Sequence, residues 1–150
     1  MYNLTVLSIV LVMAIFSVSN AACENGGKVI FSCQTAKGKV IEVCDSGKTI
    51  DYSFGKPKGT PEIVVRAPRS EASTFQWQGV GRYISYTVEI PNGNTTYRVF
   101  WGSDRITEQH AIEAGVNVEV NKELKSTVKC SNEKPIIQRM EDINLKPVKQ

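Results

Sequence analysis

Residues 83–101, YISYTVEIPNGNTTYRVFW, decide the fold, because they hold two alternating stretches around one tight turn. Asn92-Gly93 is a strong signal for a two-residue hairpin turn, since both residue types tolerate a positive φ. A turn centred there sets Ile90 opposite Thr95 and continues the pairing along both strands. The pairs that follow are Val88 with Tyr97, Tyr86 with Val99 and Ile84 with Trp101. One face of the hairpin is then apolar and the other mostly polar, which is typical of an antiparallel sheet that covers a core.

Two more turns predict three further strands upstream of this hairpin. Ala36-Lys37-Gly38 fits a three-residue loop with Gly38 in the left-handed conformation, and pairs Cys33 with Ile41. Ser46-Gly47 fits a second two-residue turn and sets Val43 against Ile50. The three strands share one apolar face, made of Val29, Phe31, Cys33, Ile41, Val43, Ile50, Tyr52 and Phe54.

The rest of the chain continues this pattern. We expect strands at residues 61–66, 75–78 and 116–120, and a return strand through 124–130 after a loop at 121–123. Residues 107–114 favour a short helix closed by Gly115. Many short strands with little helix predict an all-β fold, an antiparallel sandwich or barrel of about eight to nine strands. The alternation is lost from Ser131, so residues 131–150 are expected to form a loosely ordered tail.

The N-terminus predicts export. Residues 4–18 are apolar and too few to span a bilayer comfortably, and the small residues Ser19 and Ala21 follow them. We therefore expect a signal peptide at residues 1–21, a single β-domain at residues 22–130, and a periplasmic or secreted location. An uncleaved anchor and a lipid anchor on Cys23 are the alternatives.

The four cysteines predict two structural disulfides. In the registers above Cys33 points into the core, Cys44 lies on the opposite face, and Cys130 shares the inward face of its strand with Val128. A disulfide needs Cβ atoms that face each other, so we predict Cys33–Cys130 and Cys23–Cys44. The cysteine spacings match no zinc pattern and include no Cys-x-x-Cys, which argues against a metal or redox site.

No motif predicts catalysis. His110 is the only histidine, and no Gly-x-Ser-x-Gly sequence is present. The available carboxylates, Glu62, Glu89, Asp104 and Glu108, do not occur in apolar settings that would raise a pKa. The formal net charge of +3 is too small, for an exported chain, to indicate nucleic-acid binding. We therefore expect no enzymatic activity, no cofactor, no metal, no nucleic-acid partner and no transmembrane segment after processing.

Loops predict where a partner would bind. If the strands alternate in direction, the longer loops gather at one end of the sheet, where recognition usually occurs. That end is basic, and its candidate binding residues are Lys37, Lys56, Lys58, Arg82, Tyr83, Arg105 and His110. A basic, partly aromatic surface suits a protein with an acidic surface or an anionic glycan. The alternative is that these lysines and arginines only keep the surface soluble.

Three short stretches carry a resemblance to known proteins. FSCQTAKGK at residues 31–39, VCD at 43–45 and YSFG at 52–55 resemble small exported bacterial proteins of unassigned role. More distantly, the size, export signal and disulfide-tied β architecture resemble periplasmic lysozyme inhibitors, which insert a Ser-Gly-x-x-Tyr loop into the enzyme's cleft. Residues 79–83, GVGRY, keep the spacing of that tyrosine without the Ser-Gly opening.

The resemblance implies a non-enzymatic inhibitor or immunity-type protein that acts on a cell-wall enzyme. Two other functions stay open. One is a small-ligand carrier with an apolar barrel interior lined by Tyr52, Tyr86, Tyr97 and Trp101. The other is an exported hydrolase.

Overall fold

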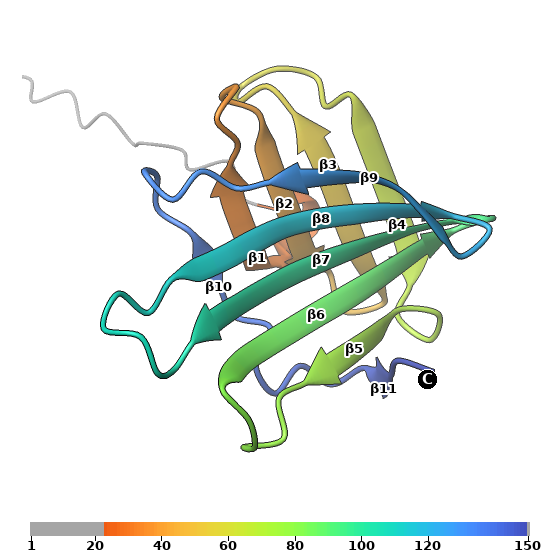
Figure 1. Cartoon of the computed structure of the whole chain (residues 1–150). Coiled ribbons are helices and arrows are strands. Elements are labelled where there is room, and N and C mark those ends of the chain that lie inside the picture. Colours follow the sequence, from red (N-terminus) through yellow and green to blue (C-terminus); the bar gives the residue numbers. More distant parts are fainter. Residues whose placement is uncertain (1–22, 150) are drawn as a thin grey trace, which may run out of the picture.

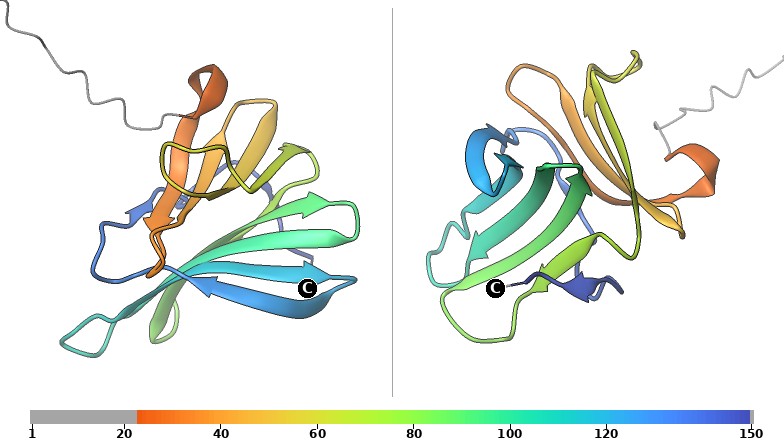
Figure 2. Two further views of the ribbon diagram at one scale, coloured as in Figure 1. Left: turned by 90° about the horizontal axis from the view of Figure 1, so that it is seen from above. Right: turned by 90° about the vertical axis from the view of Figure 1, so that its right-hand side faces the viewer.

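Two β-sheets pack face to face as a sandwich (Figures 1 and 2). The computed structural model describes residues 23–149, except for the side chain of Asn25. The predicted signal peptide, residues 1–21, lies outside the described residues. None of the helical structure in the described part is long and apolar enough to cross a membrane.

The strands follow one another in chain order within each sheet, apart from two short tail strands. After a 3-10 turn, η1 (Glu24–Gly26), the first sheet has the order β10-β1-β2-β3-β4 and the second the order β11-β5-β6-β7-β8-β9. The first comprises β1 (Lys28–Gln34), β2 (Val40–Asp45), β3 (Thr49–Gly55), β4 (Ile63–Pro68) and β10 (Ile137–Gln138). The second comprises β5 (Ser73–Gln76), β6 (Tyr83–Asn92), β7 (Thr95–Asp104), β8 (Ile112–Val120), β9 (Glu123–Lys129) and β11 (Lys146–Pro147).

The core lies between the sheets and consists of the side chains that alternation predicts to face inward. Ile41, Ile50, Val88 and Val99 are fully buried. Tyr52 of the first sheet stacks on Tyr97 of the second, with ring centroids 4.7 Å apart. Burial of these apolar faces is the main stabilising contribution to the sandwich.

The predicted registers of the β6–β7 and β2–β3 hairpins are each wrong by two residues, and the cause is the same in both. Ile90 pairs with Tyr97 rather than Thr95, and Val43 pairs with Tyr52 rather than Ile50. In both hairpins the glycine takes the first central position of the turn rather than the second, with φ of 83° at Gly47 and 61° at Gly93, as in type II′ turns. A shift of two residues keeps every side chain on its face, so the predicted core is unchanged.

The first hairpin follows its predicted register except at its start. Gly38 has a φ of 79° and Cys33 pairs with Ile41, as expected. A bulge between Val29 and Phe31 then turns Ile30 into the core in place of Val29. A bulge adds one residue to one strand and so changes which side chains face inward.

The predicted helix at residues 107–114 is wrong. These residues form a loop and then the start of β8, and Gly115 lies within that strand. A Cβ atom on Gly115 would lie 2.2 Å from the carbonyl oxygen of Val128. The glycine is therefore needed for the close approach of β9 and does not cap a helix.

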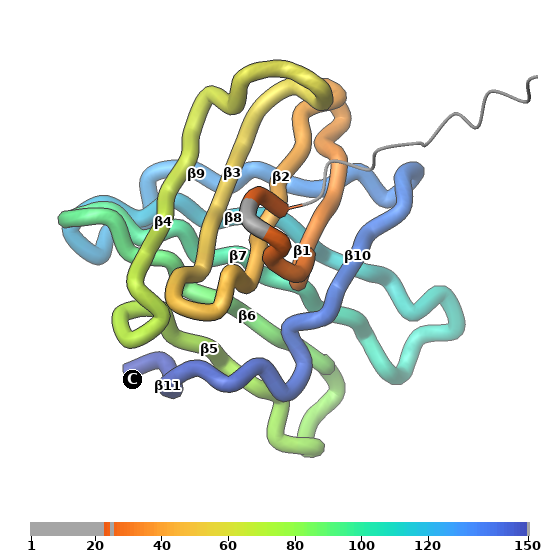
Figure 3. The backbone as a smooth tube through the Cα atoms, turned by 180° about the vertical axis from the view of Figure 1, so that it is seen from behind, coloured from red at the N-terminus to blue at the C-terminus, as the bar shows by residue number. Residues whose placement is uncertain are grey.

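The C-terminal segment, expected to be loosely held, packs along both sheets (Figure 3). β10 pairs with β1, and β11 pairs in parallel with β5. Met140 is fully buried, and its carbonyl accepts a 2.8 Å hydrogen bond from the Gln76 side chain. Alternation cannot reveal this, because the segment docks through separate apolar residues rather than through one face of a long strand.

Both predicted disulfides are confirmed. Cys23 bonds to Cys44 and Cys33 bonds to Cys130, and in each case the Cα atoms are 5.7 Å apart. The second disulfide joins β1 of the first sheet to the residue that follows β9 of the second. Two disulfides are compatible with an oxidising, extracellular compartment.

Candidate binding site

Two loops of the second sheet are held together and form the candidate site. They are the β5–β6 loop, residues 77–82, and the β7–β8 loop, residues 105–111, and we call them the paired loops. The backbone N–H of Arg105 donates to the Arg82 carbonyl at 2.9 Å, and the Arg105 guanidinium donates to the Gly81 carbonyl at 3.0 Å. These bonds connect the loops directly.

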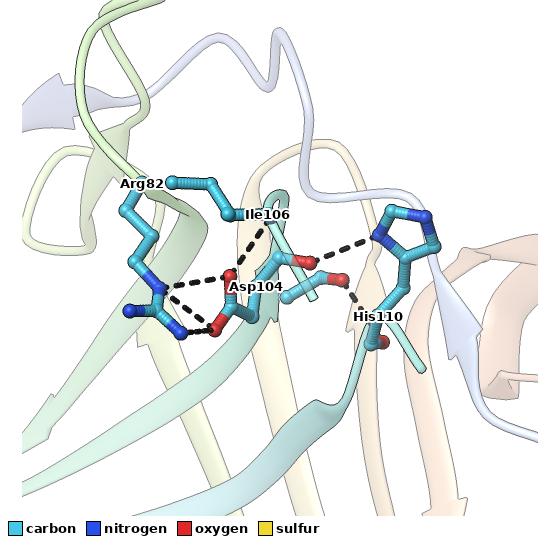
Figure 4. Close-up of polar contacts among 5 residues, drawn as sticks. Arg82, Asp104, Ile106 and His110 are labelled. Carbon is cyan, nitrogen blue, oxygen red and sulfur yellow. Dashed lines mark hydrogen bonds and ion pairs between the residues drawn. The ribbon is translucent and has the colours of Figure 1, made fainter. Parts of the chain in front are cut away.

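Asp104, at the end of β7, holds both loops in place (Figure 4). The Arg82 guanidinium donates to both Asp104 carboxylate oxygens, at 2.6 to 3.0 Å. The Ile106 N–H donates to the same carboxylate at 2.9 Å, and the His110 ring nitrogen Nδ1 lies 3.0 Å from the Asp104 carbonyl. The Arg82 guanidinium, helped by the Ile106 N–H, lowers the pKa of the Asp104 carboxyl to about 2.

Arg105 and Trp77 add a second connection. The guanidinium of Arg105 lies over the indole ring of Trp77, 4.8 Å from its centroid, and the indole N–H donates to the Val80 carbonyl at 2.9 Å. The two loops are thus joined by the bonds of Arg105 to Arg82 and Gly81 and by the contact of Arg105 with Trp77, so they are held as one unit.

Two of the exposed side chains of the paired loops are large and apolar. Val80 is 80% exposed and Ile106 is 70% exposed, the two largest values among the exposed large hydrophobic residues. Val80 lies between Gly79 and Gly81, whose φ angles of 80° and 96° suit glycine. Exposed apolar groups beside arginine and aromatic residues are typical of protein-binding surfaces.

The structure divides the seven predicted binding residues into two groups. Arg82, Tyr83, Arg105 and His110 lie on or beside the paired loops. Lys37, Lys56 and Lys58 are exposed in the β1–β2 and β3–β4 loops of the first sheet, at the top of Figure 1, away from the β7–β8 loop. The single basic end does not form, because the strands of the two sheets run across one another.

The charge of the paired loops also differs from the sequence expectation. Arg82 is paired with Asp104, and of the two other formal charges on the paired loops Arg105 is positive and Glu108 is negative. Sequence reasoning missed Trp77, Val80 and Ile106. A large apolar side chain between two glycines in a loop is the signal that could have indicated Val80.

Two of the other carboxylates considered for catalysis, Glu89 and Glu62, are paired with cations. Glu89 accepts from Arg98 at 2.7 Å, and Glu62 lies 2.8 Å from the Lys39 ammonium. Burial raises the pKa of Glu42, which lies beside the Cys23–Cys44 disulfide. The sulfurs of Cys23 and Cys44 and a carboxylate oxygen of Glu42 are close enough to one another to share a metal ion. The two sulfurs are bonded to each other, however, and are not thiolates.

The aromatic residues proposed to line a carrier's interior contact one another instead. Tyr52 stacks on Tyr97, and Tyr86 stacks on Trp101 with ring centroids 6.2 Å apart. Trp101 also borders an open cleft of about 550 Å³ between the β7–β8 loop and the C-terminal segment. Much of the interior that these rings would line is therefore filled by the rings themselves.

The pKa of Asp104 gives a test of the connection between the loops. Because that pKa is lowered, the Arg82–Asp104 pair is fully formed above the ordinary carboxyl pKa and is lost as the pH falls through about 2. Replacing Arg82 by alanine should raise the Asp104 pKa towards roughly 3.9. An NMR titration of the carboxyl carbon measures both values; the same pKa in the wild type and in Arg82→Ala would contradict this assignment.

Comparison with known proteins adds no information on function, so the function is inferred from the geometry of the paired loops. No family model, no curated protein and no solved structure matches the chain.

Proposed function

We propose that this chain is an exported, non-enzymatic binding protein that docks on another protein through its paired loops. The target we propose is a cell-wall enzyme that the chain blocks, as an inhibitor or an immunity-type protein. The observation that carries the proposal is the strong exposure of Val80 and Ile106 on loops that Asp104 and Arg105 hold in place.

Pre-organisation is the reason why this surface suits binding. A loop that must become ordered on association reduces the affinity by the entropy it loses. Here three sets of hydrogen bonds fix the two loops before any partner is present. They are the bonds from the Arg82 guanidinium to the Asp104 carboxylate, from Arg105 to the Gly81 carbonyl, and from the Trp77 indole to the Val80 carbonyl. The exposed apolar side chains can then enter a pocket with little further ordering.

The chemistry of the surface indicates what the target presents. An apolar pocket would take Val80 and Ile106. Arg105 contacts a ring and a carbonyl rather than a carboxylate, so its charge remains for an acidic group at the rim of that pocket. This favours a protein with a partly acidic cleft over an anionic glycan. Lys37, Lys56 and Lys58 would lie away from the contact.

The packing supports this proposal over the alternatives. Tyr52, Tyr97, Tyr86 and Trp101 stack in pairs, which disfavours a small-ligand carrier with an open interior. Glu62, Glu89 and Asp104 each pair with a cation, which disfavours their use as the general acid of a hydrolase.

Inhibition assays with several lysozyme types test the proposal. The disulfide-bonded chain should inhibit at least one type, and the double variant Val80→Asp/Ile106→Asp should inhibit it about tenfold more weakly. The matched control is Leu124→Asp, because Leu124 is 60% exposed on β9, outside the paired loops. Inhibition of no lysozyme type would exclude this class of target. Equal inhibition by the double variant would exclude the paired loops.

A further inference from the structure

An open cleft lies beside the paired loops, and the proposed function does not use it. It is the cleft of about 550 Å³ that Trp101 borders, and we call it the Trp101 cleft. Its walls are the end of β7, the β7–β8 loop with the start of β8, and residues 132–138, which lead into β10 (Figure 1). Its volume lies within the range of about 300–1000 Å³ that is usual for small-molecule sites.

The wall formed by residues 132–138 is held at both of its ends. At its start, the Ser131 N–H donates to the Gln34 carbonyl at 2.8 Å, directly after the disulfide that joins the two sheets. At its other end, β10 pairs with β1. The cleft is therefore formed before a ligand arrives, which lowers the entropy cost of binding.

One part of the cleft is apolar. Trp101, Ile112 and Ile136 are half-buried and line it together. The indole ring of Trp101 is held in place by its stacking on Tyr86. An aromatic ring beside aliphatic side chains suits a ligand with an apolar face, such as the C–H face of a sugar ring.

Three side-chain amides line the polar part, and each keeps a group with which to bond to a ligand. The Asn132 amide nitrogen donates to the Ile112 carbonyl at 3.2 Å, which leaves its oxygen as an acceptor. The Gln138 oxygen accepts from the Met140 N–H, which leaves its nitrogen as a donor. Gln109 is exposed, so its whole amide is accessible. Amides donate and accept hydrogen bonds, as the hydroxyl groups of a sugar also do.

The charge of the cleft favours an anion. Lys134 is exposed and forms no ion pair with the described residues, and none of the described residues that line the cleft is an aspartate or a glutamate. His110 donates from Nδ1 to the Asp104 carbonyl, because a carbonyl oxygen only accepts, and this leaves Nε2 for a ligand. A carboxylate in the cleft would meet a lysine and no side chain of like charge.

We propose that the Trp101 cleft binds a sugar that carries a carboxylate. The sugar ring would pack against Trp101 and Ile136, its hydroxyls would bond to the amides, and its carboxylate would contact Lys134. A purely apolar ligand would leave the amides without partners, and a neutral sugar would leave Lys134 without one. This inference does not depend on the proposed function, because Val80 and Ile106 do not line the cleft.

An NMR titration at pH 7 tests the proposal, with glucuronic acid, N-acetylmuramic acid and glucose as the probes. The indole N–H signal of Trp101 should shift with at least one of the two acids, with a dissociation constant of about 1 mM. Glucose should bind about tenfold more weakly, because it has no carboxylate. The indole of Trp77 is the internal control, since it donates to the Val80 carbonyl within the paired loops and should not shift. The acid that binds more tightly shows whether the carboxylate is recognised on the sugar ring or on a side arm.

Two variants separate the contact to the carboxylate from the contacts to the hydroxyls. Lys134→Ala should weaken binding of the acid about fivefold and leave glucose binding unchanged, because the lysine contacts the carboxylate alone. Gln109→Ala should weaken binding of the acid and of glucose by the same factor. Lys56→Ala is the matched control, because Lys56 is an exposed lysine in the β3–β4 loop, and should bind like the wild type. The three residues are exposed, so these substitutions should preserve the fold.

Four results would overturn the proposal. They are a Trp101 signal that shifts with neither acid, glucose that binds as tightly as the acids, an unchanged affinity for the acid in Lys134→Ala, and a shift of the Trp77 signal in place of the Trp101 signal. The last result would place the sugar on the paired loops.

Discussion

Replacing Cys33 and Cys130 together by alanine is expected to lower the free energy of unfolding by about 4–5 kcal/mol. The two residues are 97 positions apart, so their bond closes a long loop in the unfolded chain and removes much of its conformational entropy. The bond also joins the two sheets, because Cys33 lies in β1 and Cys130 directly follows β9. Its loss frees the unfolded chain and removes a covalent link across the sandwich.

Urea unfolding measures this loss, and the other disulfide is its matched control. Cys23 and Cys44 are 21 positions apart, so removing their bond should cost about 3 kcal/mol. The cysteines of both pairs are largely shielded from solvent, which makes the two substitutions comparable. A larger loss for the Cys23/Cys44 variant than for the Cys33/Cys130 variant would contradict the assigned role of the longer bond.

Replacing Met140 by alanine should lower the free energy of unfolding by about 3 kcal/mol. Met140 is fully buried although it lies in a segment with almost no regular structure. Its removal leaves a cavity under the segment that carries β10 and β11, and those strands cover β1 and β5. The effect should therefore reach both sheets.

The matched control for Met140 is a neighbour that points outward. Ile137 is 41% exposed, so Ile137→Ala should cost less than about 1 kcal/mol in the same urea titration. A similarly small cost for Met140→Ala would mean that the segment after Ser131 is as loosely held as its sequence suggests.

Side-chain facing was predictable from sequence except at the bulge of β1, whereas the register was predicted correctly for the first hairpin and wrongly for the two hairpins with two-residue turns. Alternation placed Val88, Val99 and Tyr86 in the core correctly, because a strand repeats every two residues. The predicted orientations of the cysteine side chains also gave both disulfide pairings correctly. The register depends on which turn position the glycine takes, and Asn92-Gly93 is compatible with either choice.

The candidate site was predictable only in part. Arg82, Arg105 and His110 were indicated as loop residues with Tyr83 at their edge, and all four lie on or beside the paired loops. The pairing of Arg82 with Asp104 joins residues 22 positions apart and follows no local pattern, so the loss of basic character could not be anticipated. The separation of the three lysines depends on how the sheets cross, which alternation within one sheet does not encode.

Capture of a partner from periplasmic extract tests the central claim most directly, because it does not depend on which enzyme is the target. Immobilised wild type should retain a specific protein, and so should the variant with alanine at Lys37, Lys56 and Lys58. The double variant Val80→Asp/Ile106→Asp should not retain it. Retention by the double variant, or its loss in the lysine variant, would contradict binding through the paired loops.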